Sequence, residues 1–266
     1  MMQTDFLVIG SGIAGLTFAL KTAQKLPESK ITIITKADEG ESNTKYAQGG
    51  IAVALDNILD SFQKHIDDTL ICGDGLCNPA IVELVVKEGP ERMKEFIEWG
   101  ANFDRNASGK YDLGREGGHS VNRILHHKDV TGLEMERTLL QQIHAAQNIT
   151  VLQHHFAIDL ITDHHRPGKA SKWRSYNQCY GVYSLNRANG KIEKIISKVT
   201  LLATGGAGQV YRNTTNPIIA TGDGVAMAHR AKALITNMEF IQFHPTALYN
   251  PVSYTHLRAH ETKANL

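Results

Sequence analysis

The sequence has few cysteines and lacks the spacing of a metal site. Its three cysteines, Cys72, Cys77 and Cys179, form an odd, sparse set that is typical of free thiols in a reducing compartment. Cys72 and Cys77 have no second pair that would complete a zinc site, and the histidine doublets lack ligand spacing. We therefore expect no metal centre.

Charge and hydropathy exclude further classes of protein. The 28 basic residues nearly balance the 27 acidic ones, so the net charge of +1 favours neither nucleic acid nor an anionic membrane as a partner. No apolar run approaches the roughly 20 residues that a membrane helix needs. The N-terminus enters an apolar stretch almost at once, without a basic leader or a cleavage site. We expect a cytoplasmic protein that binds neither nucleic acid nor membranes.

The first 26 residues carry the clearest pattern. A continuous apolar run over 6–9 predicts a strand buried on both faces. Gly10, Gly12 and Gly15 follow in G-x-G-x-x-G spacing, and apolar residues then recur at helical period. A strand, this glycine turn and a helix together predict dinucleotide binding, because the backbone can approach a pyrophosphate at the helix N-terminus. An incidental glycine turn is the alternative.

A second apolar stretch, "KITIITK", predicts a strand that ends at Lys36. An NAD-binding fold usually places an acidic residue there, on the ribose. Lys36 therefore counts against a simple NAD site, although Asp38 and Glu39 follow closely. Three roles are open for Lys36: a contact to phosphate, a contact to ribose, or a cap on the strand.

The middle of the chain predicts helices. They are expected over 59–72, over 79–88 with Gly89 as terminator, and from Pro90 to Trp99. A fourth amphipathic helix is predicted over about 129–147, and its apolar face would hold Leu133, Leu139, Leu140 and Ile143.

The later part predicts strands. Two short strands are expected over 149–161, and a hairpin turned at Asn189–Gly190. A separate apolar strand over 199–203 is stopped by Gly205 and Gly206. It suggests that the chain returns to the first sheet and places a second glycine turn against a cofactor.

One loop, "LGREGGHS" over 113–120, sets Arg115, Glu116 and His119 around two glycines. A polar turn in which the charges face water explains it. A ligand site explains it equally well, since glycines leave room beside the charged groups.

Five motifs in register resemble one family. They are "SNTKYAQGGIAV" at 42–53, "REGGHS", "ATGGA", "TGDGVAMA" and "EFIQFHPTALY". Over residues 4–251 they resemble the flavoproteins that comprise L-aspartate oxidases, fumarate reductases and succinate dehydrogenases, most closely the aspartate oxidase branch. The resemblance implies an α/β, Rossmann-like FAD-binding domain with a parallel sheet, helices and a β-meander insertion, followed by the start of an α+β capping domain.

The resemblance also implies domain boundaries. Residues 1–238 would be an incomplete FAD-binding domain, and 239–251 the beginning of the capping domain. Residues 252–266 depart from the family pattern and are expected to be a non-native tail. The arginine proposed as the family's general base corresponds to no residue here, so the chain alone is expected to be inactive.

FAD is the implied cofactor. Because Asn43 stands where the membrane-bound relatives carry a His that bonds covalently to flavin, the FAD is expected to be non-covalent. Two alternatives stay open: "AQGG" as a glycine turn before a strand at 51–54, and Asp223 as a helix N-cap. The implied cofactor residues are Gly10, Ser11, Gly12, Ile13, Ala14, Gly15, Lys36, Asn43, Thr44, Lys45, Tyr46, Ala47, Gln48, Gly49, Gly50, Phe156, Ala157 and Asp223.

The resemblance further implies a substrate site. Glu116 would pair with the ammonium of L-aspartate, a charge that succinate lacks, while His244 and Thr246 would bind a carboxylate; a buried, satisfied histidine is the alternative for His244. The implied reaction oxidises L-aspartate to iminoaspartate, with O2 or fumarate as electron acceptor and hand-over to quinolinate synthase. A soluble fumarate reductase or succinate dehydrogenase-like flavoprotein, and a non-catalytic FAD-binding fragment, are the alternatives.

Overall fold

The computed structural model describes residues 1–55, 60–163 and 178–243. These residues form two compact units. The first contains residues 1–45 and the described residues from 139 onward, and the second contains 46–138. The predicted domain boundaries at 238 and 251 stay predictions, and the expected tail over 252–266 lies outside the described residues.

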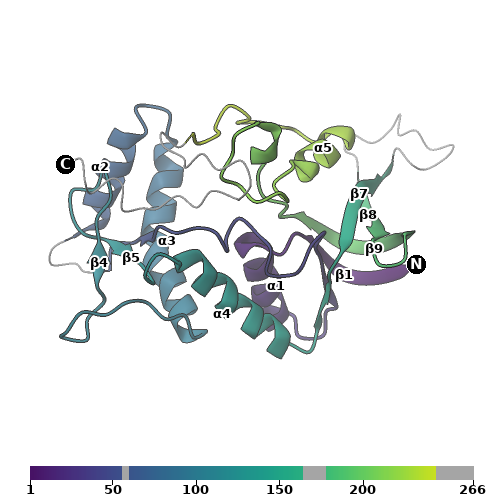
Figure 1. Cartoon of the computed structure of the whole chain (residues 1–266), viewed down its shortest axis with the longest axis horizontal. Helices are drawn as coiled ribbons and strands as arrows, with labels where there is room; N and C mark the ends of the chain where they lie inside the picture. Colours follow the sequence, from purple (N-terminus) through teal and green to yellow (C-terminus); the bar gives the residue numbers. More distant parts are fainter. Residues whose placement is uncertain (56–59, 164–177, 244–266) are drawn as a thin grey trace. The chain divides into compact units, whose positions relative to one another are not determined.

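The first unit is built on a six-stranded sheet (Figure 1). Its order is β6-β2-β1-β9-β8-β7, in which β6, β2, β1 and β9 run parallel while β9, β8 and β7 form an antiparallel meander. This arrangement confirms the Rossmann-like α/β fold with a meander. The strands are β1 (Met2–Ile9), β2 (Ile31–Ile34), β6 (Ile149–Leu152), β7 (His155–Thr162), β8 (Cys179–Asn186) and β9 (Lys191–Leu202).

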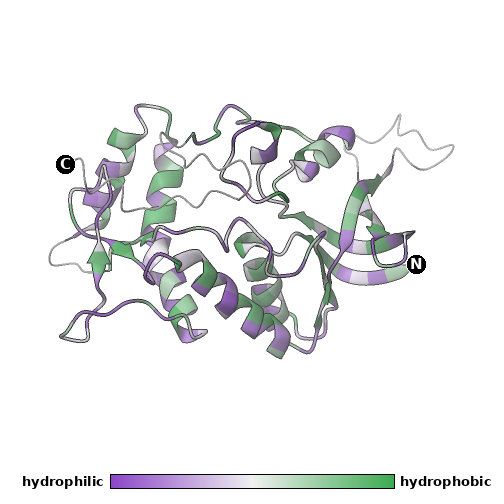
Figure 2. Ribbon diagram, viewed as in Figure 1, coloured by the Kyte–Doolittle hydropathy of each residue, from purple (hydrophilic) through white to green (hydrophobic). Residues whose placement is uncertain are grey.

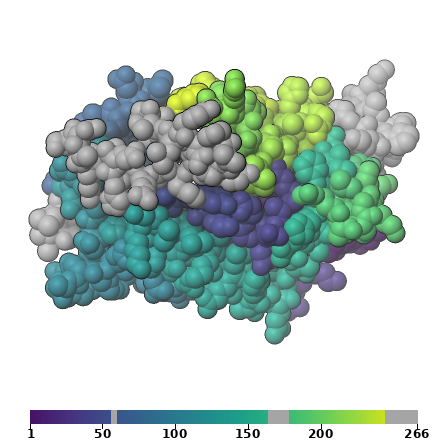
Figure 3. Space-filling view, viewed as in Figure 1, coloured from purple at the N-terminus to yellow at the C-terminus, as the bar shows by residue number. Residues whose placement is uncertain are grey.

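Strand β1 lies in the middle of this sheet because its apolar run can be buried on both faces. Leu7 and Val8 are completely buried, and β1 pairs with β2 on one side and β9 on the other. Only small areas of the purple N-terminal segment reach the surface of the face in Figure 3. Helix α1 (Ile13–Lys25) follows directly and buries an apolar stripe of Leu16, Ala19, Leu20 and Ala23.

Strand β9 corrects the sequence prediction of a hairpin followed by a separate strand. The turn lies at Gly190, as predicted, with φ +69°, but Lys191–Leu202 is one continuous strand. Its first half pairs with β8, from Lys191 to Ile196, and its other edge pairs with β1 up to Leu202. Ile195 and Ile196 pair with both β8 and β1. The backbone pairing therefore passes directly from one partner strand to the other, and β9 is not interrupted.

The buried apolar residues of helix α4 (Thr131–Ala145) include Met135, Leu139 and Ile143, which recur every four positions. Hydrophilic and hydrophobic residues alternate around it in Figure 2. The expectation that Leu133 belongs to this face is wrong, since its side chain is 45% exposed. Leu133 lies four positions before Arg137 and eight before Gln141, which are both exposed, so it belongs to the solvent-facing side of the helix.

The remaining helices of the first unit are short. Helix α5 (Asp223–Arg230) contacts β7, and a 3₁₀ turn, η2, covers Gly208–Val210. One core cluster joins the sheet to α5, and it consists of Leu7, Ile9, Ile34, Ala157, Leu160, Val182, Ile195 and Met227.

The second unit contains a small antiparallel sheet and two helices. The sheet has the order β3-β5-β4, with β3 (Ile51–Ala52), β5 (Ile124–Leu125) and β4 (Leu113–Gly114). Helix α2 (Phe62–Cys72) is capped by Ser61, whose side chain accepts a hydrogen bond from the backbone N–H of Lys64.

Helix α3 (Pro79–Glu98) corrects the prediction of two helices divided at Gly89 and Pro90. The helix continues through both residues. Val86, before the proline, and Met93 and Phe96, after it, are all buried, and α2 and α3 contact one another. Packing of this shared face outweighs the hydrogen bond that Pro90 cannot donate. Among the helices that the structure describes, none combines the length and apolar character required to cross a bilayer.

Candidate functional site

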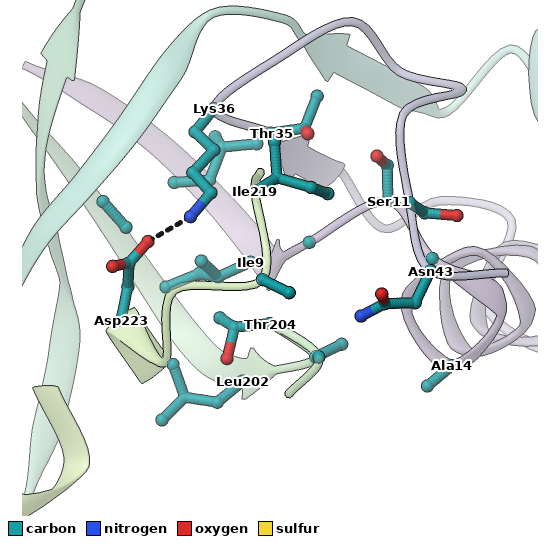
Figure 4. A pocket seen from close by; sticks show the side chains of 18 of the residues that line it. Ile9, Ser11, Ala14, Thr35, Lys36, Asn43, Leu202, Thr204, Ile219 and Asp223 are labelled. Carbon is teal, nitrogen blue, oxygen red and sulfur yellow. Dashed lines mark hydrogen bonds and ion pairs between the residues drawn. The ribbon is translucent and has the colours of Figure 1, made fainter. Parts of the chain in front are cut away.

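A cavity of about 490 Å³ lies in the first unit, where the carboxyl ends of the parallel strands meet the loops that follow them. Its lining comes from the glycine turn after β1, the end of β2, residues 41–44, the start of β7, the loop after β9 and the start of α5. Ligands of open α/β sheets bind in this place. In Figure 4, Lys36 and Asp223 lie at one end of the cavity, and Ser11, Asn43 and Ala14 at the other.

Many of the residues predicted for the cofactor line this cavity. Gly15 and Lys45 are not among its lining residues. Those that line it are Gly10, Ser11, Gly12, Ile13, Ala14, Lys36, Asn43, Thr44, Phe156, Ala157 and Asp223.

The glycine turn leaves no room for side chains at two of its three positions. Gly10 has φ +114°, and a methyl group there would lie 2.2 Å from the carbonyl oxygen of Ala203. At Gly15 it would lie 2.1 Å from the carbonyl oxygen of Gly10. Helix α1 therefore packs directly against the turn, which is the geometry that a dinucleotide requires.

The same turn carries polar groups that fit a phosphate. Gly12 is the N-cap of α1 and brings no capping side chain, so the first-turn N–H groups are left for other acceptors. One of them, from Ile13, donates to Thr44 Oγ1 over 3.1 Å. The hydroxyl of Ser11 is buried and has no hydrogen-bond partner among the described residues. A buried hydroxyl of this kind is expected to meet a polar ligand, so the residues present fit a bound dinucleotide.

Lys36 and Asp223 form an ion pair at the end of the cavity. The distance from Lys36 Nζ to Asp223 Oδ2 is 2.5 Å, and Lys36 Nζ also lies 2.6 Å from Thr221 Oγ1. The ammonium lies 5.9 Å from the centre of the Phe156 ring. Gly222 occupies the N-cap of α5, so Asp223 is the first helical residue rather than the cap. The Asp223 carboxylate lines the cavity, and its Oδ1 atom accepts a hydrogen bond from the Thr221 hydroxyl over 2.8 Å.

The loop after β9 forms the second glycine turn of the cavity. Gly205 has φ +69°, and a methyl group there would lie 3.4 Å from Asn43 Nδ2. Thr204 packs on the first turn of α5, since a methyl group at Gly224 would lie 1.8 Å from Thr204 Oγ1. Sequence reasoning expected this turn from the glycine-stopped strand.

Other lining residues were not predicted. Thr35, Ser42 and His155 lie next to predicted site residues in the sequence, and Glu41 lies two positions before Asn43; this proximity was the available signal. Ile219, Ala220 and Met227 had no signal beyond their proximity to the "TGDG" motif.

Apart from Gly15 and Lys45, which belong to the first unit, the remaining predicted residues of the described chain belong to the second unit. Tyr46, Ala47, Gln48, Gly49 and Gly50 belong to this unit, together with the "GREGGHS" loop. His244 and Thr246 lie outside the described residues. That all of the predicted cofactor and substrate residues form one site stays a prediction.

The small sheet brings two of the predicted motifs together. Strand β3 directly follows Gly50, β4 directly precedes Arg115, and both pair with β5. Gly50 packs so closely on β5 that a methyl group would lie 2.4 Å from the carbonyl oxygen of Leu125. A methyl group at Gly49 would lie 3.3 Å from Glu116 Oε1. The Glu116 carboxylate thus lies beside the backbone of the "AQGG" motif.

Comparison with known families identifies the class of protein. A family model described as an FAD binding domain matches residues 5–262. The chain therefore belongs to the FAD-binding domain family, and FAD is the cofactor of this domain.

Within this family, the chain is similar to proteins named L-aspartate oxidase. The chain is 52% identical over 92% of its length to the chloroplastic L-aspartate oxidase of Oryza sativa subsp. japonica, and 45% identical over 96% to L-aspartate oxidase 1 of Ralstonia nicotianae. It spans 36% and 46% of the length of these two proteins.

Solved structures show the same fold. The Mycobacterium smegmatis Sdh1 complex matches with a TM-score of 0.84 and 34% identity, over 96% of this chain and 43% of the other. The E. coli quinol fumarate reductase FrdA matches with a TM-score of 0.77 and 34% identity, over 86% and 37%.

Proposed function

We propose that the protein carrying this chain oxidises L-aspartate to iminoaspartate, with FAD as hydride acceptor and O2 or fumarate as the final electron acceptor. The observation that carries the proposal is the position of Glu116, whose carboxylate lies beside Gly49. It supplies a negative charge next to Gly49 and Gly50, which the family resemblance assigns to FAD binding. The identity to named L-aspartate oxidases supports the same substrate.

The residues of the cavity would hold the cofactor through its polar groups. The N–H groups at the start of α1 and the hydroxyl of Ser11 would donate to the pyrophosphate, and Asp223 would accept from ribose hydroxyls. When bound, FAD supplies the two-electron acceptor for the hydride that leaves Cα of the substrate. Gly49 and Gly50 would leave backbone N–H groups free to approach the ring.

The loop residues would select and orient the substrate. L-aspartate is a succinate with an added ammonium, and Glu116 would pair with that ammonium. Gly117 and Gly118 bring no side chains that would obstruct a ligand, while Arg115 and His119 would balance charge or bind a carboxylate. Pairing at one end and carboxylate binding at the other would fix the direction of the Cα–H bond. His244 and Thr246 would supply the second carboxylate contact.

The proposed FAD is non-covalent, because Asn43 stands where a covalent bond to flavin would need a histidine. Asn43 lines the cavity, and its amide cannot form that bond. Acid precipitation of the FAD-loaded protein is expected to release yellow cofactor into the supernatant. Flavin that stays with the pellet would contradict the proposal.

The proposed product is passed on to quinolinate synthase, in the cytoplasm. The absence of disulfides among the three cysteines fits a reducing compartment. The named plant relatives are described as chloroplastic. A reducing compartment is common to both locations, the cytoplasm proposed here and the chloroplast of those relatives.

A second candidate function is a fumarate reductase or succinate dehydrogenase-like activity. The structural likeness to the Sdh1 complex and to the quinol fumarate reductase supports it. The position of Glu116 separates the two candidates, since succinate and fumarate bring no ammonium for a carboxylate to pair with.

The deciding experiment compares the two diacids directly. A full-length protein that carries this segment, of the length of its curated relatives, is loaded with FAD and given L-aspartate or succinate under air. We expect peroxide and iminoaspartate from L-aspartate and little turnover of succinate. Equal turnover of succinate would favour the second candidate, and no turnover of either would support a non-catalytic role in FAD binding.

A further inference from the structure

A buried cluster of charges joins helix α2 to the end of the "GREGGHS" loop. The side chain of Arg123 is fully buried, and it donates two hydrogen bonds to Asp60, from Nε and Nη2, each of 2.9 Å. A third bond runs from Nη1 to Asp68 Oδ2 over 2.6 Å. Asp60 precedes α2 and Asp68 lies within it, so the arginine after the loop is tied to this helix by two carboxylates.

Asp68 also binds the loop itself. Its Oδ2 atom accepts from the backbone N–H of Ser120 over 2.8 Å and from the Ser120 hydroxyl over 2.9 Å. Burial alone would raise the pKa of Asp68, but the hydrogen bonds from Ser120 and Arg123 outweigh it and lower the pKa. Asp68 is therefore charged at neutral pH, and three donors converge on a single oxygen.

Two more residues of α2 contact the residues just before Ser120. The rings of His65 and His119 meet edge to face, with centroids 6.3 Å apart. The Cys72 thiol lies 3.9 Å from the carbonyl oxygen of Gly118. Gly118 has φ +86°, and a methyl group there would lie 2.3 Å from Cys72 Sγ, so only glycine permits this approach. Three consecutive loop residues thus rest on successive turns of one helix.

The other end of the loop has far less support. A methyl group added at Gly117 would meet no atom within 4 Å. The backbone N–H of His119 donates to the carbonyl oxygen of Glu116 over 3.2 Å, which closes a turn between Glu116 and the anchored residues. The position of Glu116 therefore depends on residues 118–120, through this turn, and on the end of β4.

We propose that Asp68 is a positioning residue: it fixes residues 118–120 to α2 and thereby keeps the Glu116 carboxylate beside Gly49. The inference rests on the proposed function, in which that carboxylate pairs with the substrate ammonium. Asp68 does not touch the substrate. Its effect on selectivity comes entirely from the place in which it holds the loop.

The structural part is tested by amide hydrogen exchange of the loop in the FAD-loaded, full-length protein that carries this segment. Asp68→Asn keeps the shape and removes the charge, and we expect the Ser120 amide and its loop neighbours to exchange about tenfold faster or more. Ser120→Ala removes only the hydroxyl bond and is expected to act in the same direction, less strongly. The milder variant keeps the test valid if Asp68→Asn folds poorly.

Glu134→Gln is the matched control. Like Asp68, Glu134 accepts from an arginine, Arg137, over 2.7 Å, and from a backbone N–H, that of Asn102, over 2.8 Å. It serves a different loop, so its loss is expected to leave exchange over 115–120 unchanged. Faster exchange in both variants would indicate general loosening and would overturn the proposal.

The catalytic part is tested by a double-mutant cycle. In the same protein, Asp68→Asn is expected to raise KM for L-aspartate and to lower the ratio of aspartate oxidation to fumarate reduction about fivefold, with kcat for fumarate reduction retained. In a Glu116→Gln background it is expected to change the ratio no further, because both substitutions act through one carboxylate.

The outcomes separate this inference from the proposed function. Unchanged exchange in both Asp68→Asn and Ser120→Ala would overturn the inference. Faster exchange in Asp68→Asn without a change in the ratio of aspartate oxidation to fumarate reduction would also overturn it, provided that Glu116→Gln does change that ratio. If Glu116→Gln itself leaves the ratio unchanged, the proposed function of Glu116 fails, and the catalytic part of the inference fails with it. The exchange measurement then still decides whether Asp68 holds the loop.

Discussion

The two units hold their functional residues by different physical means. In the first, the glycine turns follow long strands whose backbone ladders fix them, and the surrounding core is apolar. In the second, each strand has two residues, and the loop after β4 is anchored by the buried Arg123 and the carboxylates of Asp60 and Asp68. A backbone ladder is insensitive to charge, whereas a buried ion cluster depends on every one of its charges.

This contrast has a consequence for robustness. Steric changes are expected to damage the first site, because its turns leave no room beside Gly10 and Gly15. Removal or addition of a charge is expected to damage the second, because its anchors are the fully buried Arg123 and the carboxylates that pair with it. Substitutions of each kind test the comparison, and they are given from the largest expected effect to the smallest.

Arg123→Met should have the largest effect on stability. The substitution leaves the buried carboxylate of Asp60 and the partly exposed one of Asp68 without their cation, and breaking a buried pair in this way costs about 3–5 kcal/mol. The free energy of unfolding, from denaturant titration, measures it. Arg92→Met is the control, since Arg92 is 41% exposed, pairs with Glu95 on the surface of α3 and is expected to contribute about 0.5 kcal/mol or less. A loss below about 1 kcal/mol for Arg123→Met would show that the cluster does not hold the second unit.

Gly10→Ala should come next. The added methyl group meets the carbonyl oxygen of Ala203 at 2.2 Å, in a backbone conformation with φ +114°, so the turn must move. We expect a loss of about 2–3 kcal/mol and poor retention of FAD on gel filtration.

Gly40→Ala is the control within the same unit. Its methyl group would make an ordinary contact of 3.6 Å with Leu140. Normal FAD retention by Gly10→Ala would mean that the turn adapts and that the first site is less rigid than its packing indicates.

Glu116→Gln should change selectivity with little change in stability. Loss of the charge that pairs with the substrate ammonium is expected to lower kcat/KM for L-aspartate about tenfold or more, which is about 1.4 kcal/mol of transition-state stabilisation. Fumarate reduction is expected to survive, because fumarate has no ammonium. Equal losses for both substrates would indicate that Glu116 only supports the loop.

The pH dependence of stability should show the smallest effect. Burial and the nearby charge of Arg123 lower the pKa of His65. The unfolded chain therefore binds a proton at His65 at a higher pH than the folded chain does, and stability is lost as the pH falls below about 6.5. The slope from this one group is at most about 1.4 kcal/mol per pH unit.

His65→Leu tests this expectation. It should remove that slope between about pH 6.5 and the lower folded pKa, whereas His229→Gln, at an exposed position on α5, should leave it unchanged. An unaltered slope in His65→Leu would show that the buried imidazole does not determine the acid sensitivity of the second unit.

The sequence predicted those parts of the structure that local chemistry determines. The strand, glycine turn and helix at residues 6–25 follow from one contiguous pattern, and the turn at Gly190 follows from an Asn–Gly pair. Lys36 was recognised as a departure from the NAD pattern, but its partner Asp223 lies 187 residues away and no local pattern connects them.

The errors occurred where packing at a distance outweighs local preference. Gly89 and Pro90 predicted a helix end, yet the buried face of α3 continues across them. The cluster of Asp60, Asp68 and Arg123 gave no signal at all, because three charged residues spread over 64 positions resemble ordinary surface residues. Only the fold brings them together.

The continuous strand β9 has a consequence for tolerance to insertions. It runs from the hairpin turn at Gly190 to the cavity wall at Leu202, so the number of residues between these points fixes which of them faces the cofactor. An extra residue in the turn at 187–190 lies outside this span and leaves the spacing intact. An extra residue near Ser197 would reverse the two faces of the strand beyond it, or else shift Ala203 and the glycine turn along the sheet. Length variation among relatives is thus expected in the turn and not within the strand.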